Sequence, residues 1–446
     1  MKILLINPPP RTPSQPNVLV PPLGLAYLAA ALKKEGFKVE ILDANVLRLP
    51  WEQFRQIVKQ KKPDVAGFTG MTPTIDTTFK AAKICRPYAK YQILGGPHAS
   101  VFGKEVFQQT ADFDFVIKGE GEQALVSLLR RLLAGKKPRS FILASPIKNL
   151  DRLPFPAREL LPNHLYRYEL FPPPLTTIFT SRGCPYGCLF CDKGVFGRFY
   201  RARCPENVLE EIEEVIKKYH LRSIIFFDDL FTLDKERVIK ICQGIIKKGL
   251  KFHWKAEARV DTVDQEMLKI MKKAGCEILA YGIESANQKS LDFLRKNVTV
   301  AQIKRAIRLT KKAGIKTLGY FILGIPKESY KQAQKTIQFA QDLKCDFAQF
   351  SLLTPYPGSP LYQLAVKNGW LKTTSVKGPL DLEIEKAVLL SSQWDEEKLN
   401  KIIKEAHRRF YLRPGFILKQ ISLLIKEPGQ IPFLFKNAVQ LLKWYL

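Results

Sequence analysis

Two series of short apolar runs, each run followed by a helical pattern, restrict the fold of this chain more than any other feature. The first series occupies residues 1–135. Its expected strands are Lys2–Ile6, Val39–Leu42, Val65–Thr69, Gln92–Leu94 and Phe115–Ile117, with helices beginning near Leu23, Thr74, Ser100 and Gly121. Strands that alternate with helices predict a parallel sheet with helical crossovers. We therefore expect an α/β protein whose N-terminal domain is a doubly wound, Rossmann-like parallel sheet.

The second series occupies residues 175–372. Its expected strands are Thr177–Thr180, Ser223–Phe227, Phe252–Ala258, Ile278–Ile283, Thr317–Leu323 and Phe347–Leu352. Long amphipathic helices, such as 206–219 and 235–248, fit between these strands. These βα units are fewer than the eight that close a standard barrel. The second series therefore predicts a partial (β/α)6 TIM-like barrel.

The remaining segments lack this alternation. Residues 136–174 are rich in proline and predict a linker between the two domains. Residues 373–446 predict a mainly helical, basic extension with an amphipathic helix over 395–411. Basic residues interleaved with apolar ones suit a cap over the open side of the barrel, which we favour. They also suit a segment that lies on an anionic membrane surface.

The net charge of +29 is the unusual property of the composition. It predicts either attraction to an anionic partner (nucleic acid, lipid surface or phosphorylated substrate) or a lysine-rich solvated surface. No apolar run approaches the ~20 residues that span a bilayer. The apolar stretch Ile3–Ile6 is too short for a signal peptide. We expect a cytoplasmic protein, with peripheral membrane contact as an alternative.

Cys184, Cys188 and Cys191 form a Cys-x3-Cys-x2-Cys motif directly after the first strand of the second series. Three thiolates can hold three irons of a [4Fe–4S] cluster and leave the fourth iron open. A structural zinc site completed by Cys204 is the alternative. Zinc sites usually combine two short ligand pairs, and this sequence has no second pair. The motif therefore predicts a [4Fe–4S] cluster with an open coordination position.

This motif, with Phe190 as the aromatic residue before the last cysteine, resembles the signature of radical S-adenosylmethionine (SAM) enzymes. The resemblance extends over residues 175–372. It implies that the amino and carboxylate groups of SAM bind the open iron. One electron from the cluster then cleaves SAM to methionine and a 5′-deoxyadenosyl radical, which abstracts hydrogen from an unactivated carbon.

The resemblance also assigns roles to residues at the strand ends. Asp228 and Asp229 stand where an acidic motif of the family contacts the amino group of SAM, although the commoner motif is Gly-Gly-Glu. Arg259 is expected near the carboxylate of SAM. The further residues expected at the SAM site are Glu257, Glu284, Ser285 and Ile322, of which 284–285 would face the ribose and Ile322 the adenine. The alternative role for the charged residues is a strand-end salt bridge.

Loops of the first domain resemble the cobalamin-binding domain found upstream of a large group of radical SAM enzymes. The matching stretches are Asn7-Pro8-Pro9, 22–29, 69–73, 95–99 and 118–122. The residues expected to contact cobalamin are Thr69, Thr72, Gly95, Gly96, His98, Gly119 and Glu120. The Asp-x-His-x-x-Gly motif that supplies a cobalt ligand in the methionine-synthase type is absent. His98 is therefore either near the corrin or a hydrogen-bonded loop residue, and a scaffold without cobalamin is the alternative for the domain.

These expectations combine into a radical SAM enzyme that cleaves SAM at a [4Fe–4S] cluster and uses cobalamin to methylate a carbon of a hydrophobic, small-molecule or lipid-like substrate. A low-potential electron donor is required. The alternatives are a non-methylating radical cyclase, a lipid- or tetrapyrrole-modifying enzyme, and an iron–sulfur redox or sensing protein. An RNA methylthiotransferase would need a second cluster, but Cys85 is the one cysteine of the first domain, so no nucleic acid partner is expected. No catalytic residue beyond the cofactor-binding positions is assigned.

Overall fold

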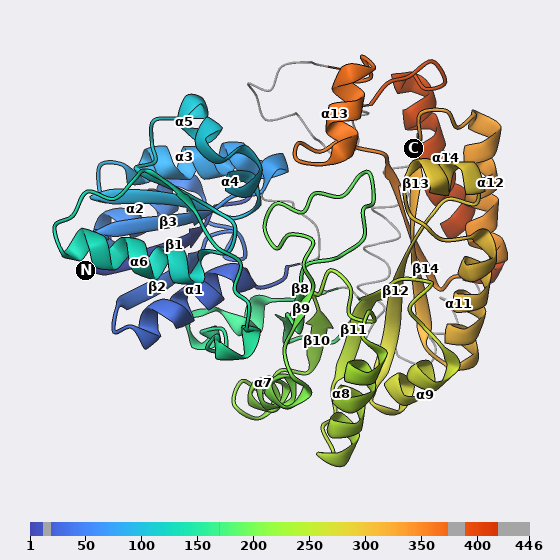
Figure 1. Ribbon diagram of the computed structural model, residues 1–446, viewed down its shortest axis with the longest axis horizontal. Coiled ribbons are helices and arrows are strands. Elements are labelled where there is room, and N and C mark those ends of the chain that lie inside the picture. The colour runs from blue at the N-terminus through green and yellow to red at the C-terminus, as the bar shows by residue number, and fades with distance from the viewer. Residues whose placement is uncertain (12–18, 169, 373–388, 418–446) are drawn as a thin grey trace.

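The chain forms two six-stranded parallel sheets that lie side by side (Figure 1). The computed structural model describes residues 1–11, 19–168, 170–372 and 389–417. The N-terminal sheet and the barrel sheet confirm the predicted fold class, a Rossmann-like domain followed by a partial barrel.

The N-terminal sheet has the strand order β2-β1-β3-β4-β5-β6. Its strands are β1 (Lys2–Asn7), β2 (Lys38–Asp43), β3 (Val65–Thr69), β4 (Tyr91–Gly95), β5 (Phe115–Lys118) and β6 (Phe141–Leu143). Its helices are α1 (Leu23–Lys34), α2 (Trp51–Lys61), α3 (Ile75–Cys85), α4 (Pro97–Phe102), α5 (Val106–Gln109) and α6 (Gly121–Leu133). The strand order reverses between β1 and β3. In open parallel sheets, ligands bind at such a switch point, beyond the carboxyl ends of the strands.

Helices cover both faces of this sheet because alternate residues of each strand are apolar on opposite sides. Leu4 and Ile6 of β1 pack with Phe54 of α2 on one face. Ile3 and Leu5 pack on the other face, in a cluster that includes residues of α1 and α6. Both faces are therefore buried, as expected for a doubly wound sheet.

Two features of the N-terminal region differ from the sequence prediction. Strand β6 lies within residues 136–174, which we predicted as a linker, and it pairs in parallel with β5 at the edge of the sheet. A strand of three residues with exposed or partly exposed side chains is too short to show the alternation of buried and exposed positions by which strands are predicted. The helix expected near Ser100 begins earlier, at Pro97, and is followed by the separate short helix α5.

The barrel sheet has the strand order β14-β13-β12-β11-β10-β7, so consecutive strands are neighbours throughout. Its strands are β7 (Leu175–Ile178), β10 (Ser223–Phe226), β11 (His253–Ala258), β12 (Cys276–Glu284), β13 (Lys316–Leu323) and β14 (Phe347–Leu352). Its helices are α7 (Pro205–Lys217), α8 (Lys235–Lys247), α9 (Gln265–Lys273), α10 (Gln288–Phe293), α11 (Val300–Lys312), α12 (Tyr330–Asp342) and α13 (Pro360–Lys367). A small antiparallel ribbon, β8 (Ser181–Arg182) with β9 (Arg201–Ala202), was not predicted. The order leaves β7 and β14 as the two edges of an open barrel.

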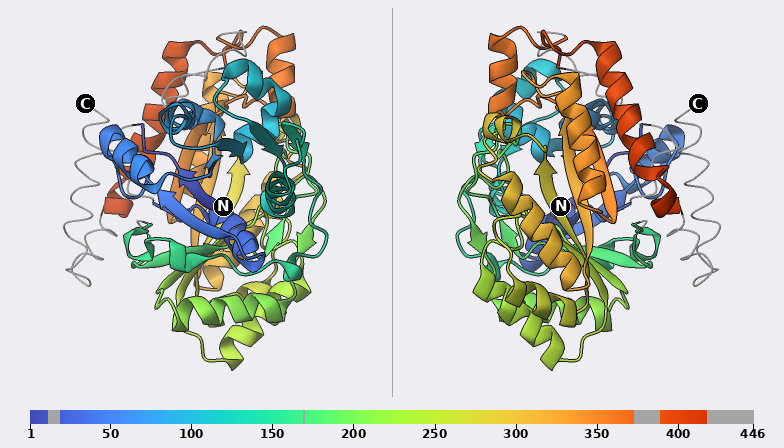
Figure 2. Two further views of the ribbon diagram at one scale, coloured as in Figure 1. Left: turned by 90° about the vertical axis from the view of Figure 1, so that its left-hand side faces the viewer. Right: turned by 90° about the vertical axis from the view of Figure 1, so that its right-hand side faces the viewer.

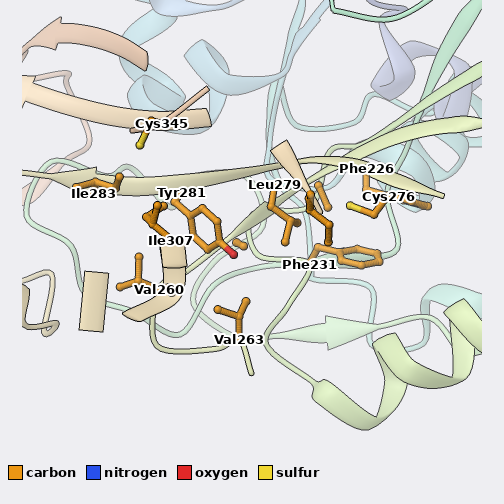
Figure 3. Packing of buried hydrophobic residues seen from close by; sticks show 14 of the residues in the cluster. Phe226, Phe231, Val260, Val263, Cys276, Leu279, Tyr281, Ile283, Ile307 and Cys345 are labelled. Atoms are coloured by element: carbon orange, nitrogen blue, oxygen red, sulfur yellow. The ribbon is translucent and has the colours of Figure 1, made fainter. Parts of the chain in front are cut away.

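The largest apolar cluster lies between the barrel strands and their outer helices. Tyr281 and Leu279 of β12 belong to it, together with the stacked rings of Phe226 and Phe231, whose centroids are 4.8 Å apart (Figure 3). The alternate residue Ile278 of β12 points to the inside of the barrel instead.

The predicted linker fills one end of the barrel interior. Phe171 packs with Ile278 of β12 and Leu318 of β13, with Tyr168 beside them. Ile278 and Leu318 lie near the amino ends of their strands. This end of the barrel is therefore plugged, and its chemistry must occur at the carboxyl end.

The predicted amphipathic helix over 395–411 is present as α14 (Glu396–Tyr411). It lies beside α12 on the outer face of the barrel and buries Ile402, Ala406 and Phe410 in the main core (Figure 2). In this position α14 serves as the outer helix after β14. The rest of the predicted extension, residues 373–388 and 418–446, lies outside the described residues. In the described part of the chain, no helix has the length and apolar character needed to cross a membrane.

A buried charge network fastens the linker to the barrel. Arg158 of the linker lies 2.6 Å from Glu211 of α7, and both side chains are almost fully buried. Arg203, which follows β9, pairs with the same carboxylate. Arg158 also donates to the carbonyl oxygen of Thr177 in β7, at 2.8 Å. One carboxylate thus balances two buried guanidinium groups from different segments.

We predict that Glu211→Gln lowers the free energy of unfolding by about 3 kcal/mol, because removal of one partner leaves buried charges unpaired. Urea unfolding followed by circular dichroism measures this loss. The matched control is Glu213→Gln on the same helix, where the carboxylate pairs with Lys217 and Lys248 near the surface. Equal unfolding midpoints for Glu211→Gln and the unchanged protein would contradict the prediction.

Candidate cofactor site

The three cysteines lie on an irregular loop that leaves the β8–β9 ribbon and passes between the two sheets (Figure 1). Cys184 is buried, and Cys188 and Cys191 are partly buried. None of the three forms a disulfide in the structure. The motif thus sits at the carboxyl end of β7, where barrel enzymes carry their active sites.

Gly183 sets the entry of the chain into the loop. Its φ is +84°, and a Cβ atom at this position would lie 2.3 Å from the carbonyl oxygen of Phe199. Side chains other than hydrogen are excluded both by this backbone conformation and by the contact. Gly187 differs, since a Cβ there would meet nothing nearer than Arg198 Nη1 at 4.0 Å.

Asp228 holds the base of the loop. Its carboxylate accepts hydrogen bonds from the backbone N–H of Thr180 at 2.6 Å and from Ser181 Oγ at 2.7 Å. The Thr180 hydroxyl donates to it as well. Burial raises the pKa of Asp228, while Arg237 and these hydrogen bonds oppose the rise. Because the Asp228 side chain is buried and fully engaged, it acts on the loop and does not line the adjacent cavity.

The far side of the loop is anchored to the barrel. The backbone N–H of Leu189 donates to the Leu294 carbonyl at 2.9 Å, and the Leu189 carbonyl accepts from Leu361 at 2.8 Å. Ile322, the residue expected beside adenine, belongs to the same apolar cluster as Leu189. Backbone bonds and apolar contacts therefore fix the segment between Cys188 and Cys191.

The donor set fits an iron–sulfur cluster better than a zinc ion. Within the described ranges, no three Cys, His, Asp or Glu side chains are arranged to hold a single metal ion. In a [4Fe–4S] cluster each thiolate binds a different iron, so its cysteines need not converge on one point. Cys204, the proposed fourth zinc ligand, instead caps α7 and accepts a hydrogen bond from the backbone N–H of Asn207 at 3.4 Å.

Asp229 differs from its neighbour in orientation. It is exposed and lines the cavity next to the cysteine loop. Lys193 lines the same cavity: burial lowers its pKa, and Cys191, Cys184 and Asp229 together raise it above the usual value. Of the two aspartates predicted for the amino group of SAM, Asp229 is the one with an accessible carboxylate.

The residues predicted for SAM in β11 and directly after it, Glu257 and Arg259, already contact neighbouring side chains. Glu257 accepts from Lys255 Nζ at 3.0 Å and from the Tyr320 hydroxyl at 3.2 Å. Arg259 pairs with Asp261 at 2.9 Å, and its guanidinium lies 3.6 Å from the ring centroid of Tyr186 in the cysteine loop. Arg259 thus contacts the loop, and its role toward the carboxylate of SAM stays a prediction.

The predicted residues of β12 are buried. Glu284 has a φ of +64° and pairs with Lys296 Nζ at 2.7 Å. Ser285 donates to Glu328 Oε1 at 3.2 Å. A non-glycine residue at positive φ stores strain, a feature that often marks functional sites. The assignment of 284–285 to the ribose of SAM stays a prediction.

A cavity of about 720 Å³ separates the cysteine loop from the N-terminal sheet. It opens at the switch point between β1 and β3, and residues 192–197 of the cysteine loop form its opposite wall. Much of the lining is apolar, including Leu23, Leu28 and Phe179. Of the residues predicted for cobalamin, those that line the cavity are Thr69, Gly95, Gly96, Gly119 and Glu120.

Gly96 shows how closely two of these loops approach each other. It has a φ of +87°, and a Cβ atom would lie 2.6 Å from the hydroxyl oxygen of Thr69. Glycine therefore lets the loops after β3 and β4 meet at the cavity floor.

His98 and Thr72 are not part of the cavity lining. His98 is buried, its Nε2 lies 2.8 Å from Gln109 Oε1, and its Nδ1 lies 3.3 Å from the Thr72 hydroxyl. Burial lowers the pKa of His98. His98 lies in helix α4 and not in a loop, and its ring is hydrogen-bonded as in the second of the two roles considered for it.

Arg182 and Lys193 were missed by the sequence reasoning. Arg182 lines the cavity and forms buried ion pairs with Glu120 at 2.7 Å and Glu122 at 2.6 Å. Both residues flank the cysteine motif closely in sequence, so proximity to the motif was the signal that could have found them. Glu120 therefore lines the cavity while its carboxylate is paired with Arg182.

Comparisons with known proteins agree with this geometry. Residues 178–340 match the radical SAM superfamily, and residues 16–129 match the B12-binding domain. An uncharacterized methyltransferase of Pyrococcus horikoshii is 34% identical, over 99% of this chain and 97% of the relative. The anaerobic magnesium-protoporphyrin IX monomethyl ester cyclase of Cereibacter sphaeroides is 32% identical, over 77% of this chain and 60% of the relative.

A solved structure shares the arrangement of both domains. The cobalamin-dependent SAM radical enzyme OxsB, with aqua-cobalamin and SAM bound, has a TM-score of 0.76 at 17% identity. The match covers 98% of this chain and 70% of that chain. At this identity the similarity supports the fold.

The three-cysteine loop at the carboxyl end of the partial barrel thus faces a cavity at the switch point of the N-terminal sheet. The chain belongs to the radical SAM superfamily, in the group whose members carry an N-terminal B12-binding domain. Its cofactors are a [4Fe–4S] cluster, SAM and cobalamin. It requires an electron donor and acts on a small molecule.

We predict that Gly183→Ala abolishes cluster assembly, because the added methyl group collides with the Phe199 carbonyl and the backbone is left strained. Gly187→Ala is the matched control, four residues further on in the same loop, and should assemble the cluster normally. Iron and sulfide content after anaerobic reconstitution measures both. A Gly183→Ala protein with full iron content would show that this turn does not constrain the loop.

Proposed function

We propose that this enzyme methylates a carbon atom of a hydrophobic small molecule in a cobalamin-dependent radical reaction. The observation that supports the proposal is the cavity between the domains, since one wall carries the loops of the B12-binding domain and the opposite wall carries residues 192–197, directly after the last cysteine of the motif. When bound, the cluster with SAM supplies a hydrogen-abstracting radical, and methylcobalamin supplies the methyl group.

The residues of this chain then have distinct tasks. Cys184, Cys188 and Cys191 hold the cluster, and Asp229 accepts hydrogen bonds from the ammonium group of SAM. Thr69, Gly95, Gly96 and Gly119 line the floor on which cobalamin is held. The apolar walls exclude water, which protects a reactive radical from side reactions.

A hydrophobic substrate fits the apolar character of the cavity. We further propose that the substrate is lipid-like or that the protein contacts an anionic membrane, because residues 418–446 combine basic and apolar side chains in their sequence. Both refinements are part of the proposal and rest on composition.

The central test is anaerobic reconstitution of the full chain, followed by incubation with dithionite and SAM, with and without methylcobalamin. We expect visible spectra to show bound cluster and corrin, and mass spectrometry to show 5′-deoxyadenosine. A panel of hydrophobic acceptors should yield products heavier by one methyl group when methylcobalamin is present. Cys188→Ala should lose the iron and form no 5′-deoxyadenosine, whereas Cys204→Ala should retain both.

The outcomes separate the proposal from its alternatives. A reconstituted protein that holds its cluster but never cleaves SAM would fit a redox or sensing module. SAM cleavage with products that have lost hydrogen and gained no methyl group would indicate a cyclase or other oxidative enzyme. Either result contradicts methyl transfer.

We predict that Asp229→Asn raises the Kd for SAM about tenfold or more, because a hydrogen bond to a charged group contributes about 1.5–3 kcal/mol. Iron content should stay unchanged. Asp192→Asn is the matched control, since this carboxylate also lines the cavity but accepts from the backbone N–H of Gly194 at 3.1 Å.

Asp228→Asn should instead reduce the iron content, because Asp228 supports the loop. Unchanged SAM affinity in Asp229→Asn would remove Asp229 from the SAM site.

A further inference from the structure

A network of four buried charges joins the cysteine loop to the B12-binding domain. Arg182 lies 2.7 Å from Glu120 and 2.6 Å from Glu122. Arg201 lies 2.5 Å from the other oxygen of Glu120. The four side chains are almost fully buried, and their formal charges cancel.

The two arginines belong to the β8–β9 ribbon that starts and ends the cysteine loop. Arg182 stands two residues before Cys184, and its backbone is paired with that of Arg201. Arg201 also donates to the Ile147 carbonyl at 2.7 Å and to the Phe196 carbonyl at 2.9 Å. Both ends of the cysteine loop are therefore tied to the same charge network.

Glu120 is the N-cap residue of α6 and Glu122 lies in its first turn, directly after the loop that follows β5, and both residues line the cavity. The Arg182 guanidinium lies between two aromatic rings, 5.1 Å from the centroid of Tyr27 in α1 and 5.0 Å from that of Phe196. Each terminal nitrogen of Arg182 contacts a different carboxylate, and the fork of a guanidinium is rigid, so these contacts fix its plane as well as its position. The network therefore constrains orientation between the domains in addition to distance.

Buried ion pairs are poor devices for stability alone, because desolvation offsets most of their attraction. An apolar contact would hold two domains together as well. Unlike an apolar contact, a set of charge pairs allows one relative position of the two domains. Any other position leaves a charge unpaired in a buried interface. A network of this kind is expected where a relative position must be exact.

We propose that Arg182, Glu120, Glu122 and Arg201 are positioning residues that set the separation between the cluster and cobalamin. The network ties the cysteine loop to a wall of the cobalamin cavity, so that both cofactors keep one relative placement during turnover. The inference goes beyond methyl transfer, since it applies to any reaction in which the two cofactors share this cavity.

The test is electron paramagnetic resonance of the full holoprotein, with cobalamin in its paramagnetic Co(II) form and the cluster reduced. Magnetic interaction between two such centres depends steeply on their separation, so the relaxation of the cobalt signal reports the placement without any substrate. In Glu120→Gln and Arg182→Gln we expect weaker and more heterogeneous interaction. Iron content should stay close to that of the unchanged protein, and saturating cobalamin keeps both cofactors bound in each variant. Arg182→Lys, which keeps the charge but lacks the two separate terminal nitrogens that contact Glu120 and Glu122, should lie between Arg182→Gln and the unchanged protein.

With a methyl acceptor identified, the same variants should lose methyl transfer on the order of 100-fold, because a misplacement of about 1 Å can cost that much. Formation of 5′-deoxyadenosine should fall much less. The matched control is Arg130→Gln, which removes an arginine from an exposed ion pair with Glu35 on the same domain and should change neither signal.

The two possible failures are distinct. Absence of methyl transfer in the unchanged protein would refute the proposed reaction and leave the magnetic measurement interpretable. Unaltered magnetic interaction in Glu120→Gln and Arg182→Gln, with both cofactors bound, would overturn the positioning role. If Arg182→Gln fails to fold, Glu122→Gln removes one Arg182 contact alone and must still weaken the interaction for the inference to stand.

Discussion

The site depends on how the cysteine loop is held in place, and buried charged side chains hold it. The loop has no regular structure of its own between β8 and β9, so its backbone polar groups and its orientation need partners from elsewhere. Asp228 binds the backbone N–H of Thr180 and the hydroxyl of Ser181 at the base of the loop, on the barrel side. Glu120 of the other domain holds the loop through the side chain of Arg182. Both carboxylates are buried, Asp228 within hydrogen bonds and Glu120 within ion pairs, so each end of this support depends on a buried charge.

Both domains present the carboxyl ends of their parallel strands to the same space. In the N-terminal sheet, the reversal between β1 and β3 opens the cavity there. In the barrel, Phe171 and Tyr168 of the linker fill the amino end of the interior, which leaves the carboxyl end as the place for chemistry. The fold of each half therefore directs its cofactor toward the other half.

Sequence patterns predicted the strands well because burial imposes a period that is visible locally. Phe347–Leu352 was predicted with the bounds that β14 has, and α14 begins one residue after the predicted start. Strand β6 was missed because its three residues are too few to show a period. The β8–β9 ribbon was missed for a related reason: its two-residue strands form through pairing across the whole cysteine loop, which no local pattern encodes.

The site was predictable where the chemistry is local and unpredictable where it depends on tertiary contacts. Three cysteines within one short motif predict a cluster directly. Asp228 and Asp229, in contrast, look equivalent in the sequence, but in the fold Asp228 is buried and Asp229 lines the cavity. His98 and Glu120 illustrate the same limit. The sequence motifs assign both residues to cobalamin, but in the fold His98 is hydrogen-bonded to Gln109 and Glu120 is paired with Arg182. The charge network between the domains joins residues that are 60 to 81 positions apart in the sequence. It becomes visible once both sheets are placed, and it explains why a loop motif of the first domain carries two glutamates beside a cavity meant for a cofactor.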